Sequence, residues 1–175
     1  FVVPELTDAD IDEIYQLRFL LEPAAASIAV AEVTSPTDLA SMSAAVDDAV
    51  AAERNGDFRA FLEANSRFHH AWRALVPNRR MSKLLDQYVG HVRFLRVLTL
   101  GDAGARKAAL TGMKAIHAAF RKRDAEGAAQ AMHKHLEAAK LFLVQAIEQI
   151  EKEKAAETAP ESSPPDSSPR RSARS

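Results

Sequence analysis

From Thr7 to about Lys154 the apolar residues recur with the period of an α-helix, and no run alternates with the two-residue period of a strand. Glycine and proline interrupt this pattern only sparsely. Amphipathic helices must bury their apolar stripes against one another. The sequence therefore predicts an all-α fold, an antiparallel bundle of six or seven helices.

Capping and breaking residues divide the pattern into segments. Thr7 is the expected N-cap of the first helix, with Asp10 in the capping-box position. Pro23 is expected to break or kink this helix, and residues 24–33 continue it. Later helices are expected at about 35–55, 57–75, 79–100 and 102–122, and from about 124 past Ile150.

The two ends have a different composition from the helical part. Residues 1–6 read as an extended linker, and because the chain begins without Met, we expect it to be a piece of a longer protein. Residues 153–175 end in a stretch rich in Ser, Pro and Arg with few apolar side chains, so we expect a disordered tail. The helical domain is therefore predicted to span residues 7–152.

Composition limits the range of partners. The net charge of −1 gives no general attraction to nucleic acid or to an anionic membrane. The absence of cysteine fits a reducing cytoplasm, and no apolar run approaches the roughly 18 residues that span a bilayer. We therefore expect a cytoplasmic protein without membrane contact.

Polar residues lie within the apolar stripes of three predicted helices. Successive helical residues are about 100° apart, so Asn65 and His69 share the apolar face of helix 57–75 while His70 points to water. The same geometry turns His117 and His135 inward from their own helices. Buried imidazoles need partners, and these could be a metal, water or a bound acid in a polar cavity. The competing interpretation is ordinary core histidines bonded to carbonyl groups.

Arg18 also falls on an apolar face, that of the first helix. Arginine is rarely buried without a partner. It is expected either to pair with Glu22 one turn away, or to bind the carboxylate of a ligand with its planar guanidinium.

Three segments resemble a known family. They are "LTDADIDEIYQLRFLLEPAAASIAV", "NSRFHHAWRALVPNRRMSKLL" and "MKAIHAAFRKRDAEGAAQAMHKHLEAA". In order and spacing they are similar to the motifs of the FadR-type C-terminal effector domain (the FCD domain) of GntR-family transcription regulators. The resemblance covers about residues 7–150.

The resemblance implies a helical domain that forms a homodimer, binds a small carboxylate effector and acts on DNA through an N-terminal winged helix that this chain lacks. Many members hold a divalent metal such as zinc or nickel with one Asp and three His. Here His69 and His135 match, but Asn65 and Met113 replace the Asp and one His. His117 lies one turn beyond Met113 on the same face, and it could replace that ligand only if the helix or the cavity shifted by about one turn. The expected metal set is therefore Asn65, His69 and His135.

The predicted effector-binding residues are Arg18, Asn65, His69, Met113, His117 and His135. Two alternatives remain open from the residues alone. One is a metal-dependent helical enzyme, although no acidic residue lies inward one turn from a histidine and no catalytic residue is assigned. The other is a helical interaction module without a ligand. For self-association, the sequence offers apolar positions off the inward face: Phe94, Val97 and Leu98.

Overall fold

The computed structural model describes residues 7–158, which form seven α-helices and one short 3₁₀-helix and contain no strand. This confirms the predicted all-α bundle. The elements are α1 (Asp8–Val30), the 3₁₀-helix η1 (Pro36–Leu39), α2 (Ala40–Asn55), α3 (Phe58–Ala74), α4 (Arg79–Gln87), α5 (Val89–Thr99), α6 (Ala103–Lys122) and α7 (Ala125–Thr158).

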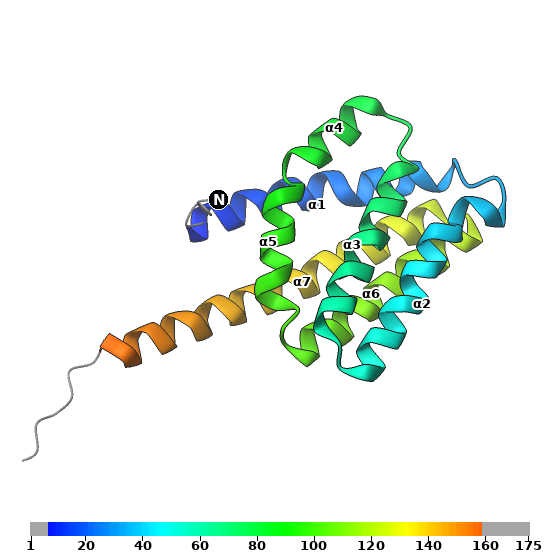
Figure 1. The fold of residues 1–175 in the computed structure, drawn as a ribbon. Coiled ribbons are helices and arrows are strands. Elements are labelled where there is room, and N and C mark those ends of the chain that lie inside the picture. Colours follow the sequence, from blue (N-terminus) through cyan, green and yellow to red (C-terminus); the bar gives the residue numbers. More distant parts are fainter. Residues whose placement is uncertain (1–6, 159–175) are drawn as a thin grey trace, which may run out of the picture.

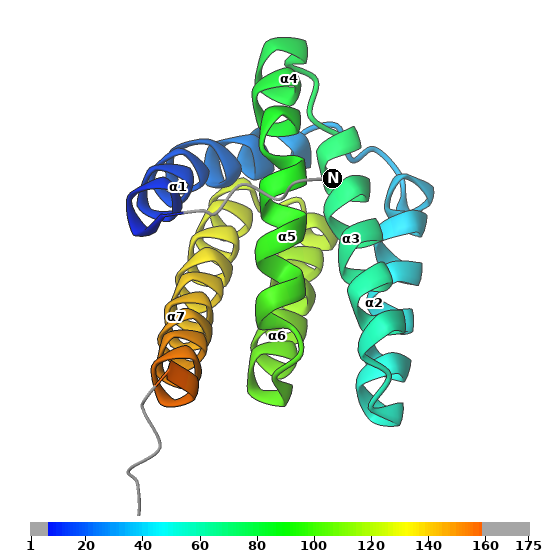
Figure 2. The same cartoon turned by 60° about the vertical axis from the view of Figure 1, so that its left-hand side comes forward.

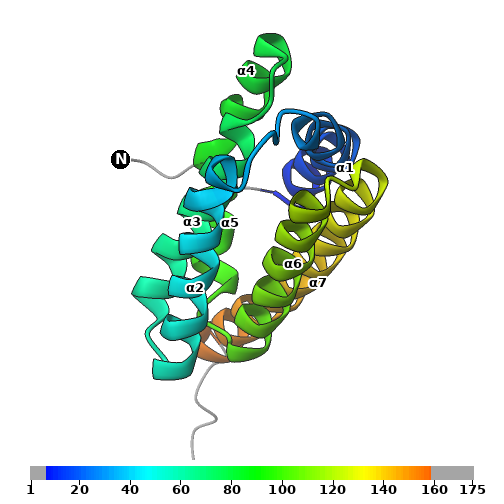
Figure 3. The ribbon, with the colours of Figure 1, turned by 90° about the vertical axis from the view of Figure 1, so that its right-hand side faces the viewer.

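The helices pack as pairs. α2 lies against α3, α6 against α7, and α1 against α7. Figure 3 shows α2 and α3 side by side on one side of the bundle, with α6 and α7 on the other and α1 across one end. α5 contacts both α7 and α3, and Figure 2 shows it between them in front of α6. Five helices (α1, α3, α5, α6 and α7) therefore surround the middle of the bundle.

α1 is continuous through Pro23, although this proline was expected from the sequence to break or kink the helix. The capping box at its start is present, with Thr7 Oγ1 accepting from the Asp10 amide and Asp10 Oδ2 accepting from the Thr7 amide. The residues just after the proline, Ala25, Ala26 and Ala29, are fully buried. Their packing outweighs the hydrogen bond that the proline removes.

The predicted helix 79–100 is two helices, which is a correction. Tyr88 separates α4 from α5, with backbone angles of φ −106° and ψ 8°. Val89 and Gly90 follow, and both have low helix propensity. α4 packs against α1, whereas α5 turns toward α7, as Figure 1 shows. Tertiary packing thus decides the break.

The hydrophobic core has two parts. The larger fills the space between α1, α2, α3, α6 and α7, and a smaller cluster of Ile11, Tyr15, Leu95 and Leu143 joins α1, α5 and α7. Phe94 and Leu98 pack against the smaller cluster, and only Val97 of the three expected surface residues is exposed. Phe94 and Leu98 therefore belong to the inner contacts of α5 rather than to a surface for self-association.

α7 continues to Thr158, beyond the predicted boundary at residue 152, and Figure 1 shows its last turns extending past the other helices. The predicted linker at residues 1–6 and the rest of the predicted tail lie outside the described residues. Among the residues that are described, no helix combines the length and the hydropathy needed to cross a membrane.

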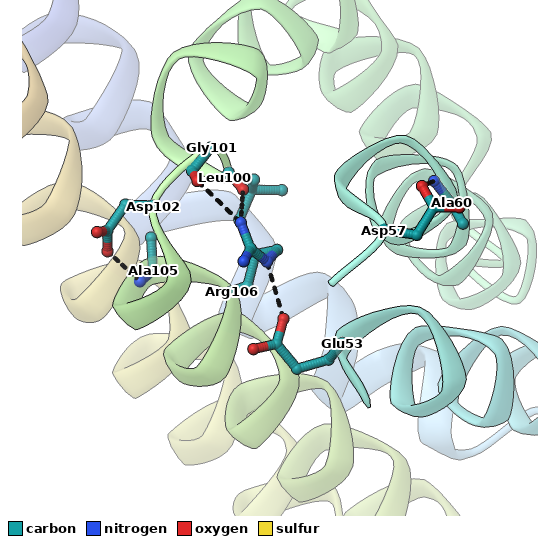
Figure 4. A network of polar contacts seen from close by, with 8 residues as sticks. All are labelled: Glu53, Asp57, Ala60, Leu100, Gly101, Asp102, Ala105 and Arg106. Carbon is teal, nitrogen blue, oxygen red and sulfur yellow. Dashed lines mark hydrogen bonds and ion pairs between the residues drawn. The ribbon is translucent and has the colours of Figure 1, made fainter. Parts of the chain in front are cut away.

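Arg106 joins three parts of the bundle. From α6, its Nε donates to Glu53 Oε2 on α2 at 2.8 Å, and its Nη1 donates to the carbonyls of Leu100 at 3.0 Å and Gly101 at 2.8 Å (Figure 4). Both side chains of the ion pair are mostly buried. Arg106 therefore ties the turn between α5 and α6 to α2.

Arg106→Met should lower the free energy of unfolding by about 1–3 kcal/mol, because it leaves a partly buried carboxylate and two carbonyls without their donor. Chemical denaturation measures this change. The matched control is Arg67→Met, which breaks an exposed ion pair with Asp48 and should cost less than about 0.5 kcal/mol. Equal losses in the two variants would contradict the role assigned to Arg106.

Candidate functional site

α3 places three polar side chains on its buried face. Asp57 caps the helix by accepting from the Ala60 amide, and the helix then presents Asn65, His69 and Trp72 one turn apart. All three are almost completely buried, while His70 is exposed, as the sequence predicts. Trp72 Nε1 donates to His69 Nδ1 at 3.2 Å. The helical period of α3 thus places these three side chains, here called the polar row, in the core.

His135 of α7 meets this row. The ring centroids of His69 and His135 are 5.3 Å apart. Gly112 of α6 makes room for the second imidazole, because a Cβ atom there would lie only 2.2 Å from His135 Nδ1. Gly112 was not among the predicted site residues, although it precedes Met113 directly.

Three buried polar atoms of this cluster have no hydrogen-bond partner among the described residues: Asn65 Oδ1, His69 Nε2 and His135 Nδ1. Asn65 uses its other polar atom, since Nδ2 donates to Met113 Sδ at 3.4 Å. An unsatisfied buried polar group costs about 1–3 kcal/mol, so such groups rarely gather by chance. This concentration of unpartnered atoms indicates a place for a ligand or ordered water.

Arg18 and Glu22 form a buried ion pair, with Arg18 Nε donating to Glu22 Oε1 at 2.7 Å. The Arg18 guanidinium also lies 4.8 Å from the centre of the Tyr15 ring. Burial alone would raise the pKa of Glu22, but the charge and hydrogen bond of Arg18 outweigh it and lower that pKa. The structural pairing expected for Arg18 is therefore present, and the guanidinium also borders the pocket described next.

A small pocket opens beside this pair and the polar row. The pocket has a volume of about 40 Å³, which is room for about three waters. Most of its lining is apolar. The lining residues are Tyr15, Arg18, Asn65, Val92, Leu95, Arg96, Thr99, Leu100, Ala105, Ala108, Ala109, His135, Ala138, Ala139 and Phe142.

Arg96 lines this pocket and was not predicted. Its guanidinium forms no hydrogen bond or ion pair with another described residue, although the charges of Arg18 and Glu22 act on it. Burial, and then the positive charge of Arg18, lower the pKa of Arg96 to about 9, so it remains charged at neutral pH. A sequence signal for it existed, because Arg96 is spaced to share one helical face with Val92, Leu95 and Thr99.

Of the six predicted effector-binding residues, some line the pocket, some lie behind its lining, and one lies elsewhere. Arg18, Asn65 and His135 line the pocket. His69 is not part of the lining and stacks behind His135 with no exposed surface, while Met113 reaches the site only through its contact with Asn65.

His117 lies elsewhere. Its Nε2 is 2.9 Å from Ser43 Oγ on α2, and the side chain is only half-buried. The structure therefore does not place it where it could replace the ligand missing at Met113. The helical period had turned it inward, but the neighbour it meets there is α2 rather than the cluster of His69 and His135.

The cluster fits a divalent metal poorly. Among the described residues, no three histidine, aspartate or glutamate side chains converge as a metal-binding group would. Asn65 offers a neutral oxygen and Met113 a thioether, and the thioether suits soft ions rather than zinc or nickel. The lone pair of His69 Nδ1 is already used by Trp72.

The geometry defines an all-helical domain with a small, partly charged pocket in its centre, which is the form of a ligand-binding domain. The FCD domain family model matches residues 13–138. Because this match spans well over half of the chain, the chain belongs to the FCD domain family, the C-terminal effector-binding domains of GntR-type regulators. A comparison with curated proteins gives no match.

Both imidazoles of the cluster are neutral in the folded protein. Burial, followed by the charge of Arg96, holds the pKa of His69 well below its usual value. Burial, followed by the charge of Arg18, lowers the pKa of His135 to about 4. The unfolded chain therefore binds protons more readily below about pH 6.5, and acid favours unfolding.

This acid penalty is absent above about pH 6.5 and grows as the pH falls toward 4, so the folded state loses stability over that range. We expect the free energy of unfolding to decrease between pH 7 and pH 4.5 by on the order of 1–4 kcal/mol. His135→Gln should flatten this profile, and the exposed His70→Gln should leave it parallel to the wild type. Denaturation curves at several pH values measure the effect, and equal slopes in all three proteins would contradict it.

Proposed function

We propose that this chain is the ligand-sensing, dimerising domain of a GntR/FadR-type transcription regulator and binds a small organic acid in the central pocket. DNA binding belongs to an N-terminal domain absent from this chain, in a cytoplasmic protein. The observation that carries the proposal is Arg96, a charged guanidinium that borders the pocket without a hydrogen bond or ion pair to any described residue. Carboxylates are the natural partners of such a group because they accept its N–H donors in pairs.

The charges around the pocket favour a monocarboxylate. Arg18 and Glu22 largely neutralise each other through their ion pair, which leaves Arg96 as the uncompensated positive charge in the lining. A second carboxylate on the ligand would face mostly alanine and leucine side chains, where burial of a charge is costly. The pocket size, about three waters, favours a molecule with few heavy atoms.

α1 provides a route from the pocket to the DNA-binding domain in this proposal. Arg18 lies on α1 beside the pocket, and α1 is the first helix of the described part of the chain. An acid that draws the Arg18 guanidinium away from Glu22 weakens a buried pair and changes how α1 packs on α7. A ligand shifts such an equilibrium only by its differential affinity for the two arrangements.

The alternative of a metal-dependent enzyme has less support. The structure brings one acidic residue, Glu22, within electrostatic range of His135, which the sequence had not indicated because the two lie on different helices. Its low pKa and its bond to Arg18 make this carboxylate a weak base. The family match is to regulatory domains and not to a catalytic family.

Arg96→Met should reduce the affinity for the bound acid at least ten-fold and leave the melting temperature nearly unchanged, since the Arg96 guanidinium has no hydrogen bond or ion pair to lose among the described residues. Arg18→Met should instead lower stability by about 3–5 kcal/mol because Glu22 stays buried without its counter-ion. Calorimetry with a panel of small mono- and dicarboxylates, run beside melting curves, measures both effects. The exposed Arg93→Met on the same helix is the control, and unchanged binding in Arg96→Met would contradict the proposal.

Self-association is proposed through the outer face of α1 and α7, which pack against each other. Leu20 of α1 is 72% exposed and Leu141 of α7 is 57% exposed, and Leu17 and Val144 are exposed beside them in sequence. Apolar side chains of this size at the surface are typical of a partner interface.

Leu20→Glu combined with Leu141→Glu should convert the dimer to a monomer in sedimentation experiments, because charges cannot be buried in an apolar interface. Leu84→Glu on α4, where the leucine is also exposed, should keep the wild-type association. A wild-type protein that stays monomeric at high concentration would argue against this domain pairing by itself.

A further inference from the structure

We propose that Trp72 holds His69 in the tautomer that carries its hydrogen on Nε2, so that His69 excludes a divalent cation and offers a hydrogen-bond donor in its place. The evidence lies in the two side chains themselves, which are one turn apart on α3 and have no exposed surface. His69 lies beside the pocket of the proposed function, against the lining residue His135, but this inference concerns a proton and a cation, so its test requires no acid.

The direction of one hydrogen bond fixes the tautomer. The indole Nε1–H of Trp72 can only donate, and it lies 3.2 Å from His69 Nδ1. Nδ1 must therefore accept with its lone pair and carry no hydrogen. A histidine with one nitrogen bare carries its hydrogen on the other, so Nε2 is an N–H donor.

This is the reverse of the arrangement that metal sites require. A histidine that binds a metal through one nitrogen donates the hydrogen on the other to a carboxylate, a carbonyl or water. If His69 bound a cation through Nε2, its hydrogen would move to Nδ1 and face the Trp72 N–H, placing two donors 3.2 Å apart. Cation binding at His69 would then cost the Trp72 hydrogen bond and leave a buried indole N–H unpaired.

The surroundings of Nε2 agree with a donor role. Nε2 is buried and has no partner among the described residues, and Asn65 one turn away presents a neutral oxygen rather than a carboxylate. Among the described residues, no acidic side chain joins the two histidines in a group that could hold a divalent cation, whereas a ligand or water oxygen would satisfy the N–H.

Nuclear magnetic resonance of the wild type tests the tautomer directly. In protein treated with a chelator and labelled with ¹⁵N in its histidines, long-range proton–nitrogen correlations show which ring nitrogen carries the hydrogen. We expect His69 with its hydrogen on Nε2, and Trp72→Phe should allow the other tautomer to appear. A wild-type His69 with its hydrogen on Nδ1 would overturn the proposal, and this measurement stands even where a variant fails to fold.

Zinc titration tests the exclusion of the cation. Asn65→Asp supplies the missing charged ligand, so the comparison is Asn65→Asp against Asn65→Asp with Trp72→Phe. We expect the double variant to bind zinc at least ten-fold more tightly, and His69→Ala added to it should abolish the gain. Equal zinc affinity in the two proteins, or a wild-type zinc site lost in His69→Ala, would overturn the inference. Neither result depends on whether an acid binds at Arg96, so failure here and failure of the proposed function remain distinguishable.

Discussion

The buried ion pair between Arg18 and Glu22 sets the electrostatic conditions of the whole pocket. Two charges that are this deeply buried are stable only together, and the spacing of one turn of α1 holds Arg18 Nε 2.7 Å from Glu22 Oε1. Because the Glu22 carboxylate makes its ion pair with Arg18, its attraction offsets the charge of Arg96 only in part, and Arg96 stays charged beside the pocket. Burial, and then the positive charges of the two guanidiniums, lower the pKa of the neighbouring imidazoles and keep them neutral. The ion pair and the burial of the histidines together give a positive pocket beside neutral imidazoles.

The helical framework stabilises this buried polar arrangement. Apolar packing of α2 on α3 and of α6 on α7 surrounds the polar row, and Gly112 removes one side chain where His135 must fit. Protein interiors are packed so densely that an imidazole fits only where a neighbouring side chain is small or absent. The same density explains why a pocket of only a few waters remains between five helices. Polar atoms left without partners there carry a cost that a bound molecule can offset.

Helical periodicity alone predicted much of the fold and part of the site. It separated His69 from His70 and turned Asn65 and His135 inward, because those choices depend only on the angle between neighbours on one helix. It did not predict the break at Tyr88, which depends on what α4 and α5 pack against. Arg96 of α5 was also missed, although it shares a helical face with Val92 and Leu95. His117 was assigned to the wrong neighbour, because the helical period gives the direction of a side chain but not the helix that lies in that direction.

The position of Asn65 links the acid and the histidine. A carboxylate at residue 65 would lie in the same pocket lining as Arg96 and would compete with an acidic ligand for that guanidinium. A neutral amide avoids this competition and leaves the positive charge available. The same change removes the anionic ligand that a divalent cation would need, so cation binding and acid binding through Arg96 make opposite demands on this residue. The bond from Trp72 to His69 and the amide at Asn65 are therefore consistent with the proposed acid site rather than with a cation site.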